Sequence, residues 1–163
     1  MTEPRWLTPE QLCAWKKLIA VVELLPGTLE SQLQRDSGLS HFEYFTLAML
    51  SEAPDRTLRM TSLAAQTNAT LARLSHVVTR LEKRGLVRRE ACAEDRRATN
   101  AILTPAGWTT VEAAAPGHVA TVLATVIDPL TSTDVADLDR IMGRILDVLD
   151  PSHVMGGAAT TDD

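Results

Sequence analysis

Residues 60–87, "MTSLAAQTNATLARLSHVVTRLEKRGLV", restrict the possible folds more than any other stretch of this chain. Thr61 or Ser62 can begin a short helix, which "QTNAT" interrupts. Thr70 is then a suitable N-cap for a second, longer helix, and Gly85 can end it in a left-handed conformation. The apolar residues of this second helix recur at helical spacing: Leu71, Leu74, Val78 and Leu81. Two short helices joined by a tight turn form the helix-turn-helix pattern.

A β-hairpin is predicted directly after this helix pair. "LVRREACAED" has the character of a strand with mixed alternation, "RATNAILT" is its expected partner, and "AEDRR" between them is the turn. A helix-turn-helix followed by a hairpin is a winged helix. The predicted fold class is therefore a mainly α protein with a small β-hairpin wing, in which further helices flank a winged helix-turn-helix lobe.

The flanking helices are predicted from N-cap residues that precede amphipathic segments. These N-caps are Thr8, Ser40, Thr104 and Thr131. Proline-glycine pairs at 26–27 and 116–117 are expected to kink the two helices that contain them. The chain then divides into an N-terminal helix in 1–34, the winged lobe in 35–107, C-terminal helices in 108–151 and a flexible tail in 152–163.

The charge of the chain is unevenly distributed. The whole sequence carries a net charge of −5, yet residues 56–97 hold ten Lys or Arg against four Asp or Glu, a local charge of +6, which leaves −11 for the rest. A basic segment inside an acidic protein predicts an anionic partner at that segment alone. The N-terminus lacks the basic and apolar regions of a secretory signal, and no apolar run approaches the roughly 20 residues of a membrane helix. We therefore expect a cytoplasmic protein without a membrane partner.

The sequence does not predict a metal site, a cofactor or an enzyme. Cys13 and Cys92 lie far apart and outside any C-x-x-C pattern. The four histidines show no ligand spacing such as H-E-x-x-H. No Ser/His/Asp or Cys/His arrangement, phosphate loop or paired acid cluster stands out.

The predicted recognition helix presents a basic face opposite its apolar stripe. This face carries Arg73, His76, Arg80 and Lys83, and Thr70, Ser75 and Thr79 flank it. The N-terminal half of such a helix reaches base edges in the major groove, where arginine bridges guanine bidentately and hydroxyls bond several bases. Arg80 and Lys83 lie later and are expected to touch phosphates, as are backbone N–H groups at the helix start near Ser62. The alternative is an ordinary solvated helix face, with His76 as an exposed polar residue.

The turn "EDRR" places two arginines at the predicted wing tip. A single arginine there can enter the minor groove, whose negative potential attracts a guanidinium. Asp95 lies two residues before Arg97 and can bond that guanidinium, which lowers the cost of ordering it on binding. Arg96 is expected to contact a phosphate. The alternative is a polar turn with a surface ion pair worth less than about 1 kcal/mol.

Residues 80–107, "RLEKRGLVRREACAEDRRATNAILTPAG", resemble the signature stretch of the MarR family of bacterial transcription regulators. The elements R-L-E-x-x-G-L-V, D-x-R and L-T-x-x-G occur in order and at the family's spacing. The resemblance covers nearly the whole chain, because flanking helices at both ends also belong to the family's plan. By position, Asp95 and Arg97 match the family's wing pair, and residues 72–76 match its base-reading segment. Family members often have arginine where this chain has His76, so this contact is expected to differ and to depend on pH.

The resemblance implies a homodimer in which the helices of 1–34 and 108–151 intertwine. Recognition helices would enter successive major grooves of a pseudo-palindromic DNA duplex, and wings would reach the flanking minor grooves. It also implies a repressor that a small aromatic or phenolic compound releases from DNA. The apolar stripes of the terminal helices support the dimer, because nothing else predicted would bury them.

An effector crevice is expected between the dimer helices and the DNA-binding lobe. Its predicted lining, inferred from the placement of these residues, is Trp15, His41, Tyr44 and Trp108. Aromatic residues at helical spacing are more often part of a core than of a pocket, which is the alternative interpretation.

Two alternative functions remain open. Some family members sense organic hydroperoxides through a cysteine in the first helix, and Cys13 lies there beside Lys16 and Lys17, which can lower a thiol pKa. In that branch tyrosines bond the thiol, whereas here Tyr44 is the single tyrosine; a Cys13 buried in the dimer interface is the plainer interpretation. The second alternative is a winged-helix module that binds protein rather than DNA.

Overall fold

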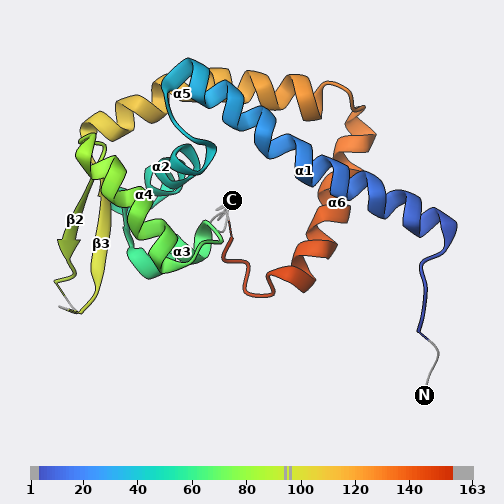
Figure 1. The fold of residues 1–163 in the computed structure, drawn as a ribbon, viewed down its shortest axis with the longest axis horizontal. Coiled ribbons are helices and arrows are strands. Elements are labelled where there is room, and N and C mark those ends of the chain that lie inside the picture. Colours follow the sequence, from blue (N-terminus) through green and yellow to red (C-terminus); the bar gives the residue numbers. More distant parts are fainter. Residues whose placement is uncertain (1–3, 94, 96, 156–163) are drawn as a thin grey trace.

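The computed structural model describes residues 4–93, 95 and 97–155. Within them, the helices are α1 (Pro9–Ser37), α2 (His41–Glu52), α3 (Met60–Gln66), α4 (Leu71–Lys83), α5 (Pro105–Val122) and α6 (Ser132–Leu149). The strands are β1 (Thr57–Arg59), β2 (Val87–Ala91) and β3 (Thr99–Leu103). A 3-10 turn, η1 (Pro54–Arg56), and a π-helical turn, η2 (Leu123–Ile127), complete the described elements. The predicted fold class, a mainly α winged helix-turn-helix, is confirmed (Figure 1).

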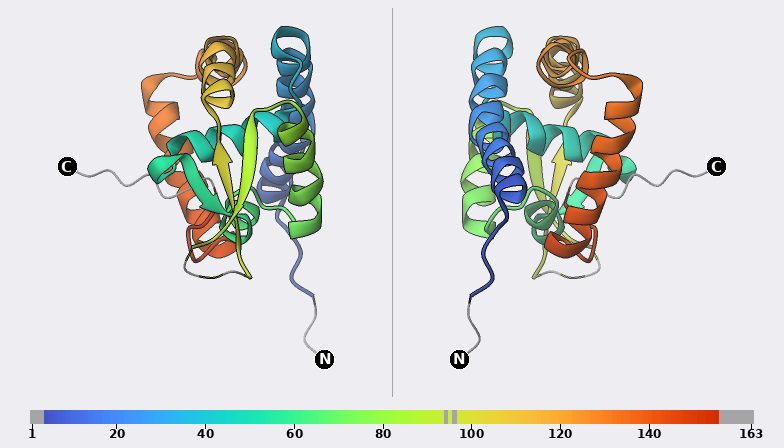
Figure 2. Two further views of the ribbon diagram at one scale, coloured as in Figure 1. Left: turned by 90° about the vertical axis from the view of Figure 1, so that its left-hand side faces the viewer. Right: turned by 90° about the vertical axis from the view of Figure 1, so that its right-hand side faces the viewer.

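A lobe and a set of long helices make up the molecule. The lobe contains α2, α3, α4 and the small sheet, with the hairpin of β2 and β3 projecting from it (Figure 1). α1 packs along α5, and both extend beyond the lobe. After η2 the chain turns, and α6 descends on the side of α5 away from α1 (Figure 2). The winged lobe is thus attached to the rest of the chain mainly through α1, α2 and α5.

The helices begin where the sequence predicts because their caps are local. Thr8, Ser40 and Thr131 each close a capping box with the residue three positions later. Thr70 and Thr104 accept hydrogen bonds from the backbone N–H groups of their N3 residues. Gly85, which follows the last turn of α4, has φ of +73°, a conformation that costs glycine nothing.

The two helices with predicted kinks continue through their prolines. α1 continues through Pro26 as one helix of 29 residues. Pro26 removes one backbone hydrogen bond, but Leu29 and Leu33 beyond it are buried, and Leu33 packs in the core of the lobe. Pro116 likewise lies inside α5.

The sheet has a third strand that the sequence analysis missed. The strand order is β1-β3-β2, and both pairs are antiparallel, with Leu58 opposite Ala101 and Arg89 also opposite Ala101. Asp55 and Arg56 precede β1 with positive φ. The Arg56 guanidinium lies 3.8 Å from the centroid of the Trp108 ring, which fixes this turn against α5.

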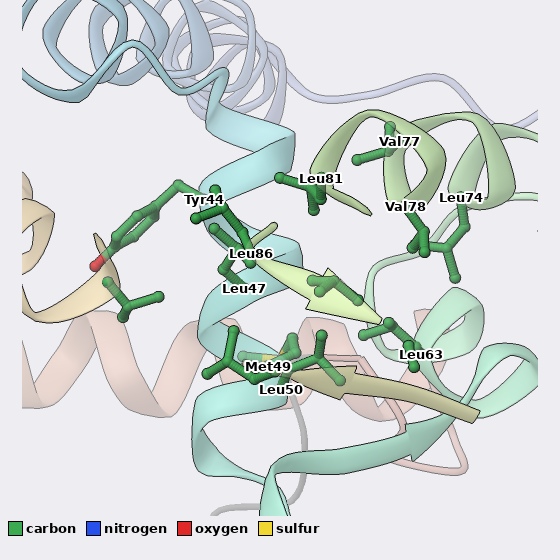
Figure 3. Close-up of a cluster of buried hydrophobic side chains, with 14 of the residues drawn as sticks. Tyr44, Leu47, Met49, Leu50, Leu63, Leu74, Val77, Val78, Leu81 and Leu86 are labelled. Atoms are coloured by element: carbon green, nitrogen blue, oxygen red, sulfur yellow. The ribbon is translucent and has the colours of Figure 1, made fainter. Parts of the chain in front are cut away.

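The core of the lobe is a leucine-rich cluster from α1, α2, α3, α4 and the sheet (Figure 3). Three of the four residues in the predicted α4 stripe, Leu74, Val78 and Leu81, are fully buried. The fourth, Leu71, is the first residue of α4 and is 49% exposed, whereas Val77, which the predicted stripe omitted, is buried. The glycine of L-T-x-x-G is required here, since a Cβ on Gly107 would lie 2.1 Å from the Leu86 carbonyl oxygen.

The long helices leave many apolar side chains exposed. No described residue of α6 is buried, although its stripe of Val135, Leu138, Ile141, Ile145 and Leu149 is apolar. The segment Pro105–Ile127 has a mean hydropathy of 1.3 and is long and apolar enough to cross a membrane. The sequence analysis expected no apolar run of that length. Core helices of soluble proteins pass the same test, so a single helix of this kind does not by itself indicate a membrane protein.

Candidate nucleic-acid interface

α4 presents the predicted basic side chains along its exposed face. Arg73, His76, Arg80 and Lys83 are all exposed, while Leu74, Val77, Val78 and Leu81 on the opposite side enter the core. This division follows from the sequence, because the helix is strongly amphipathic. The result is a row of cationic and polar groups on one face of the second helix of the helix-turn-helix.

The two arginines on this face are anchored by the first turn of α2. The Arg73 guanidinium lies 4.3 Å from the centroid of the Phe42 ring, and Arg80 Nε donates to Glu43 Oε1 at 3.1 Å. The Arg80 side chain remains 57% exposed. Both side chains are thus held in place on α4 while still facing solvent, which lowers the ordering cost of binding an anion.

Glu43 has a larger role than the sequence analysis assigned. Its side chain is 9% exposed, accepts from the Ser40 backbone N–H at 2.9 Å and faces both Arg80 and Arg84. Arg84 Nη1 also donates to the Gly38 carbonyl at 3.2 Å. The sequence indicates only the capping role, because the ion pairs join residues about 40 positions apart.

Four further predicted contacts lie beside this face. Thr70 is the exposed N-cap of α4 and accepts from the Arg73 N–H at 3.2 Å. Ser62 is half-buried in the first turn of α3. Ser75 and Thr79 are half-buried on the side of α4 that faces β2, where Arg89 donates to both hydroxyls. The sequence analysis gave no role to Arg89, although the alternation in "VRREA" places it on the opposite face of the strand from Arg88.

The described part of the wing tip orders its turn through Asp95. The Arg97 backbone N–H donates to Asp95 Oδ1 at 3.0 Å, and the Ala98 N–H donates to the Asp95 carbonyl at 2.9 Å. The sequence predicted a contact from the Asp95 carboxylate to the Arg97 guanidinium; the described contact is to the amide instead. The Arg97 side chain is exposed. Arg96, the predicted phosphate contact, lies outside the described residues.

A groove of about 230 Å³ separates the wing from the helix-turn-helix. It is lined by Met60, Thr61, Leu71, Ser75, Arg89, Arg97, Ala98 and Thr99. Two arginines from the hairpin and one end of α4 therefore meet around the same concave surface.

The predicted effector residues are only partly brought together. Tyr44 and His118 rings lie with centroids 4.6 Å apart, and His41 stacks on His118 at 6.4 Å. Trp108 instead lies beneath Arg56, and Trp15 is 50% exposed on α1. His118 was missed because only the packing of α5 on α1 and α2 brings it to the others.

Burial governs the titration of this histidine pair. Desolvation lowers the pKa of His118, and the neighbouring His41 lowers it further. Desolvation also lowers the pKa of His41, against a smaller opposing effect of the Glu30 carboxylate. Two buried atoms at this junction, Gln32 Oε1 and His118 Nδ1, have no hydrogen-bond partner in the part of the chain that the structure describes.

The cysteines lie apart from this junction. Cys13 is exposed on α1, and Cys92 is buried with Arg59 Nη2 at 3.6 Å from its Sγ. Among residues 4–93, 95 and 97–155, no group of three or more His, Cys, Asp or Glu could hold a metal ion.

An exposed basic helix in a helix-turn-helix, followed by a β-wing, defines the class of winged-helix DNA-binding proteins. The MarR family model matches residues 39–99. Sco3205 of Streptomyces coelicolor, a MarR family transcriptional regulator solved in complex with DNA, is 46% identical, covers 93% of this chain and 95% of its own, and superposes with a TM-score of 0.87. The chain therefore belongs to the MarR family; it is a transcription regulator and not an enzyme.

Two further relatives agree with this assignment. AbsC, a MarR family transcriptional regulator of Streptomyces coelicolor, is 42% identical, with 90% of this chain and 98% of its own covered, at a TM-score of 0.84. The HTH-type transcriptional repressor YetL of Bacillus subtilis is 35% identical over 81 residues, 50% of this chain. The match spans about half of that curated relative, 48% of its length.

Proposed function

We propose that this protein is a cytoplasmic, homodimeric repressor that binds a pseudo-palindromic DNA site and is released by a small aromatic or phenolic ligand. The observation that carries the DNA-binding part is the exposed basic face of α4 beside an arginine-bearing wing, in a segment of charge +6 within a chain of charge −5. The acidic remainder disfavours DNA binding elsewhere on the molecule. The similarity to a regulator solved with DNA and to a curated repressor supports the same function.

Each exposed side chain has a role in this proposal. Arg73 and His76, early in α4, contact base edges, and Arg80 and Lys83 contact phosphates. Arg97 enters the minor groove from a turn that Asp95 holds in shape. The remaining proposed contacts are those of Ser62, Thr70 and Arg96 with the DNA backbone.

The proposed dimer uses the helices outside the lobe. Residues 1–34 and 108–151 supply the interface, and residues 35–107 form the DNA-binding lobe. Large apolar side chains exposed on these helices include Leu12, Trp15, Ile19, Leu123, Ile141 and Leu149. A patch of this extent marks an interaction surface, and a two-fold axis lets the same patch cover itself on a second copy.

The proposed effector site is the junction of α1, α2 and α5. Gln32 Oε1 and His118 Nδ1 are buried polar atoms, and a ligand hydroxyl can satisfy either because it both donates and accepts. Tyr44 and His41 supply the aromatic walls. This proposal replaces the predicted Trp15 and Trp108 with Gln32 and His118. The redox alternative would instead use Cys13, which is exposed on α1, whereas Tyr44, the single tyrosine of the chain, packs against His118.

One experiment tests the DNA-binding proposal. The protein is incubated with a pool of random DNA duplexes, and bound sequences are amplified through successive rounds. We expect enrichment of an inverted repeat, with an affinity that falls steeply as salt rises, since several phosphates are neutralised. A pool that stays random, or a flat salt dependence, would contradict the proposal and favour a protein-binding module. The enriched duplex then serves to screen small phenolic acids for release in a gel-shift assay.

A further inference from the structure

Arg89 of β2 joins the wing to the recognition helix. Its Nε donates to Glu82 Oε2 at 2.8 Å, its Nη2 to Thr79 Oγ1 at 3.0 Å and its Nη1 to Ser75 Oγ at 3.4 Å. The Arg89 backbone N–H donates to Glu82 Oε1 at 2.9 Å. The three partners form one stripe of α4 at positions i, i+4 and i+7, so a single guanidinium spans two turns of that helix.

The hydroxyl of Thr79 uses its single hydrogen within α4 and accepts a bond from the wing. It donates to the Ser75 carbonyl at 2.9 Å and accepts from Arg89 Nη2. Both Thr79 and Ser75 are half-buried, whereas Arg73 and His76 on the same helix are exposed. The geometry therefore directs these two hydroxyls toward the wing rather than toward a DNA base.

The Arg89 guanidinium is also neutralised. The Arg89 and Glu82 side chains are 30% and 28% exposed, so their ion pair is partly shielded from water. All three guanidinium nitrogens already have acceptors on α4. Such a group is poorly suited to bind a phosphate, but well suited to hold two elements at a fixed distance and angle.

We propose that Arg89 is a positioning residue for DNA recognition, which sets the angle between α4 and the wing so that both enter one half-site. This inference rests on the proposed function. β2 continues for two residues beyond Arg89, to Ala91, and at about 3.3 Å per residue the turn at Asp95 can lie up to roughly 20 Å from Arg89. A swing of about 10° at Arg89 therefore moves the tip by roughly 3 Å, enough to displace Arg97 from a groove.

Lysine at position 89 separates positioning from direct contact. Arg89→Lys keeps the charge, and a lysine satisfies a phosphate well. However, one ammonium on a flexible stem cannot bridge three acceptors spread over two turns. The matched control is Arg88→Lys at the preceding residue of the strand. The Arg88 side chain lies on the face opposite Arg89, where it is 52% exposed and paired with Glu90.

The test uses the full-length protein and the duplex that the wild type enriches from a random pool. We expect Arg88→Lys to bind within about twofold of wild type and Arg89→Lys to lose about tenfold or more. Hydroxyl-radical footprinting should show that Arg89→Lys loses protection at the flanking minor grooves and keeps it at the centre of each half-site. Adding Arg97→Ala to Arg89→Lys should cost little more, because the wing is already displaced.

Distinct outcomes overturn the inference and the proposed function. A pool that enriches no duplex refutes both. An enriched duplex that Arg89→Lys binds within about twofold of wild type, or losses that add fully with Arg97→Ala, refute the inference alone. If Arg89→Lys unfolds at a much lower temperature than Arg88→Lys, its loss of binding could come from unfolding. Thr79→Val then tests the inference, because it keeps every charge and removes one hydrogen bond to Arg89. If Thr79→Val binds the duplex as tightly as wild type and protects the flanking minor grooves as wild type does, the positioning role of Arg89 is refuted.

Discussion

At the scale of single residues, the wing shows how a flexible side chain can be made ready for binding. Asp95 bonds the Arg97 amide, and the Ala98 amide bonds the Asp95 carbonyl, so the backbone of the turn is fixed while the Arg97 side chain stays exposed. Ordering the backbone in advance leaves only side-chain rotamers to be fixed on binding, at roughly 0.5 to 1.5 kcal/mol for such a side chain.

Arg97→Ala is expected to weaken binding to the enriched duplex by about tenfold or more, because one groove contact is worth about 1–3 kcal/mol. Affinity should be measured by gel-shift titration across salt concentrations, and dimer formation by light scattering. Arg35→Ala is the control, since Arg35 is an exposed arginine on α1 paired with Asp36. Equal affinities of Arg97→Ala and Arg35→Ala would show that the wing does not contact DNA.

Residue-scale features differ in how far the sequence predicts them. The basic face of α4 follows from periodicity, because the core stripe fixes which side is exposed. The residues that contact this face cannot be predicted in this way. Phe42 and Glu43 lie about 30 to 40 positions before Arg73 and Arg80, and no local pattern links them. Arg89 escaped notice for the same reason, since an arginine in a strand is ordinarily a solvated side chain.

At the scale of elements, the first turn of α2 is the joint between the long helices and the recognition helix. Its three successive residues contact different neighbours. His41 stacks on His118 of α5, Phe42 lies beneath Arg73, and Glu43 binds Arg80. A change at the α5 side of this turn therefore reaches α4 through one helical turn, which fits an effector site at the same junction.

Glu43→Gln tests the mechanical strength of this joint. The nearly buried carboxylate holds Arg80 and Arg84 and closes the α2 cap, so its neutralisation should lower the free energy of unfolding by about 1–3 kcal/mol. Glu90→Gln is the control, because the Glu90 side chain is 52% exposed and its pair with Arg88 is worth under about 1 kcal/mol. Urea unfolding measures both, and equal losses would contradict the role assigned to Glu43.

The histidine pair at this joint predicts a pH dependence of stability. Burial lowers the pKa of both His41 and His118 in the folded protein, so the unfolded chain takes up these protons more readily. Stability should therefore be unaffected by the pair above the ordinary histidine pKa of about 6.5, and should fall as the pH drops below it. The Glu30 carboxylate, which also bonds the His41 backbone N–H, moderates the effect.

Thermal unfolding between about pH 5 and pH 8 measures this dependence. His118→Gln should flatten the decline, because it removes one titrating group and the repulsion it shares with His41. His76→Gln is the control, since His76 is exposed on α4. A decline that is the same in wild type and in His118→Gln would exclude the pair as its source.

Elements with local signals were predictable, and elements built by distant pairing were not. Five helix starts follow from their caps, because a cap involves residues only three positions apart. Strand β1 has three residues, too few for a period, and exists through its pairing with β3 some forty positions later. The prediction of the effector residues was partly wrong for a related reason, because periodicity gives the buried face of a helix but not the helix that packs against it.

At the scale of the whole molecule, charge and apolar surface are segregated. The basic residues gather in the lobe, within a stretch of net +6, and the remainder of the chain is acidic. The large exposed apolar side chains gather instead on α1, α5 with η2, and α6. In the proposed function, the basic surface binds the DNA and the apolar surface packs against a second copy of the chain.

Ile141→Glu tests the self-association surface. Ile141 lies 43% exposed in the apolar stripe of α6, and a buried carboxylate without a partner would oppose dimerisation. We expect light scattering to report a monomer at micromolar concentration. The enriched duplex should then be bound about 100-fold more weakly or worse, because two linked half-sites gain affinity from their effective concentration.

Ala136→Glu is the matched control for this substitution. It introduces the same charge on the same helix, but about 140° around the helix axis from Ile141 by the 3.6-residue period. It should remain dimeric and bind DNA normally. A dimer that survives Ile141→Glu would place the interface elsewhere, and a monomer that binds the inverted repeat as tightly as wild type would mean that each lobe acts alone.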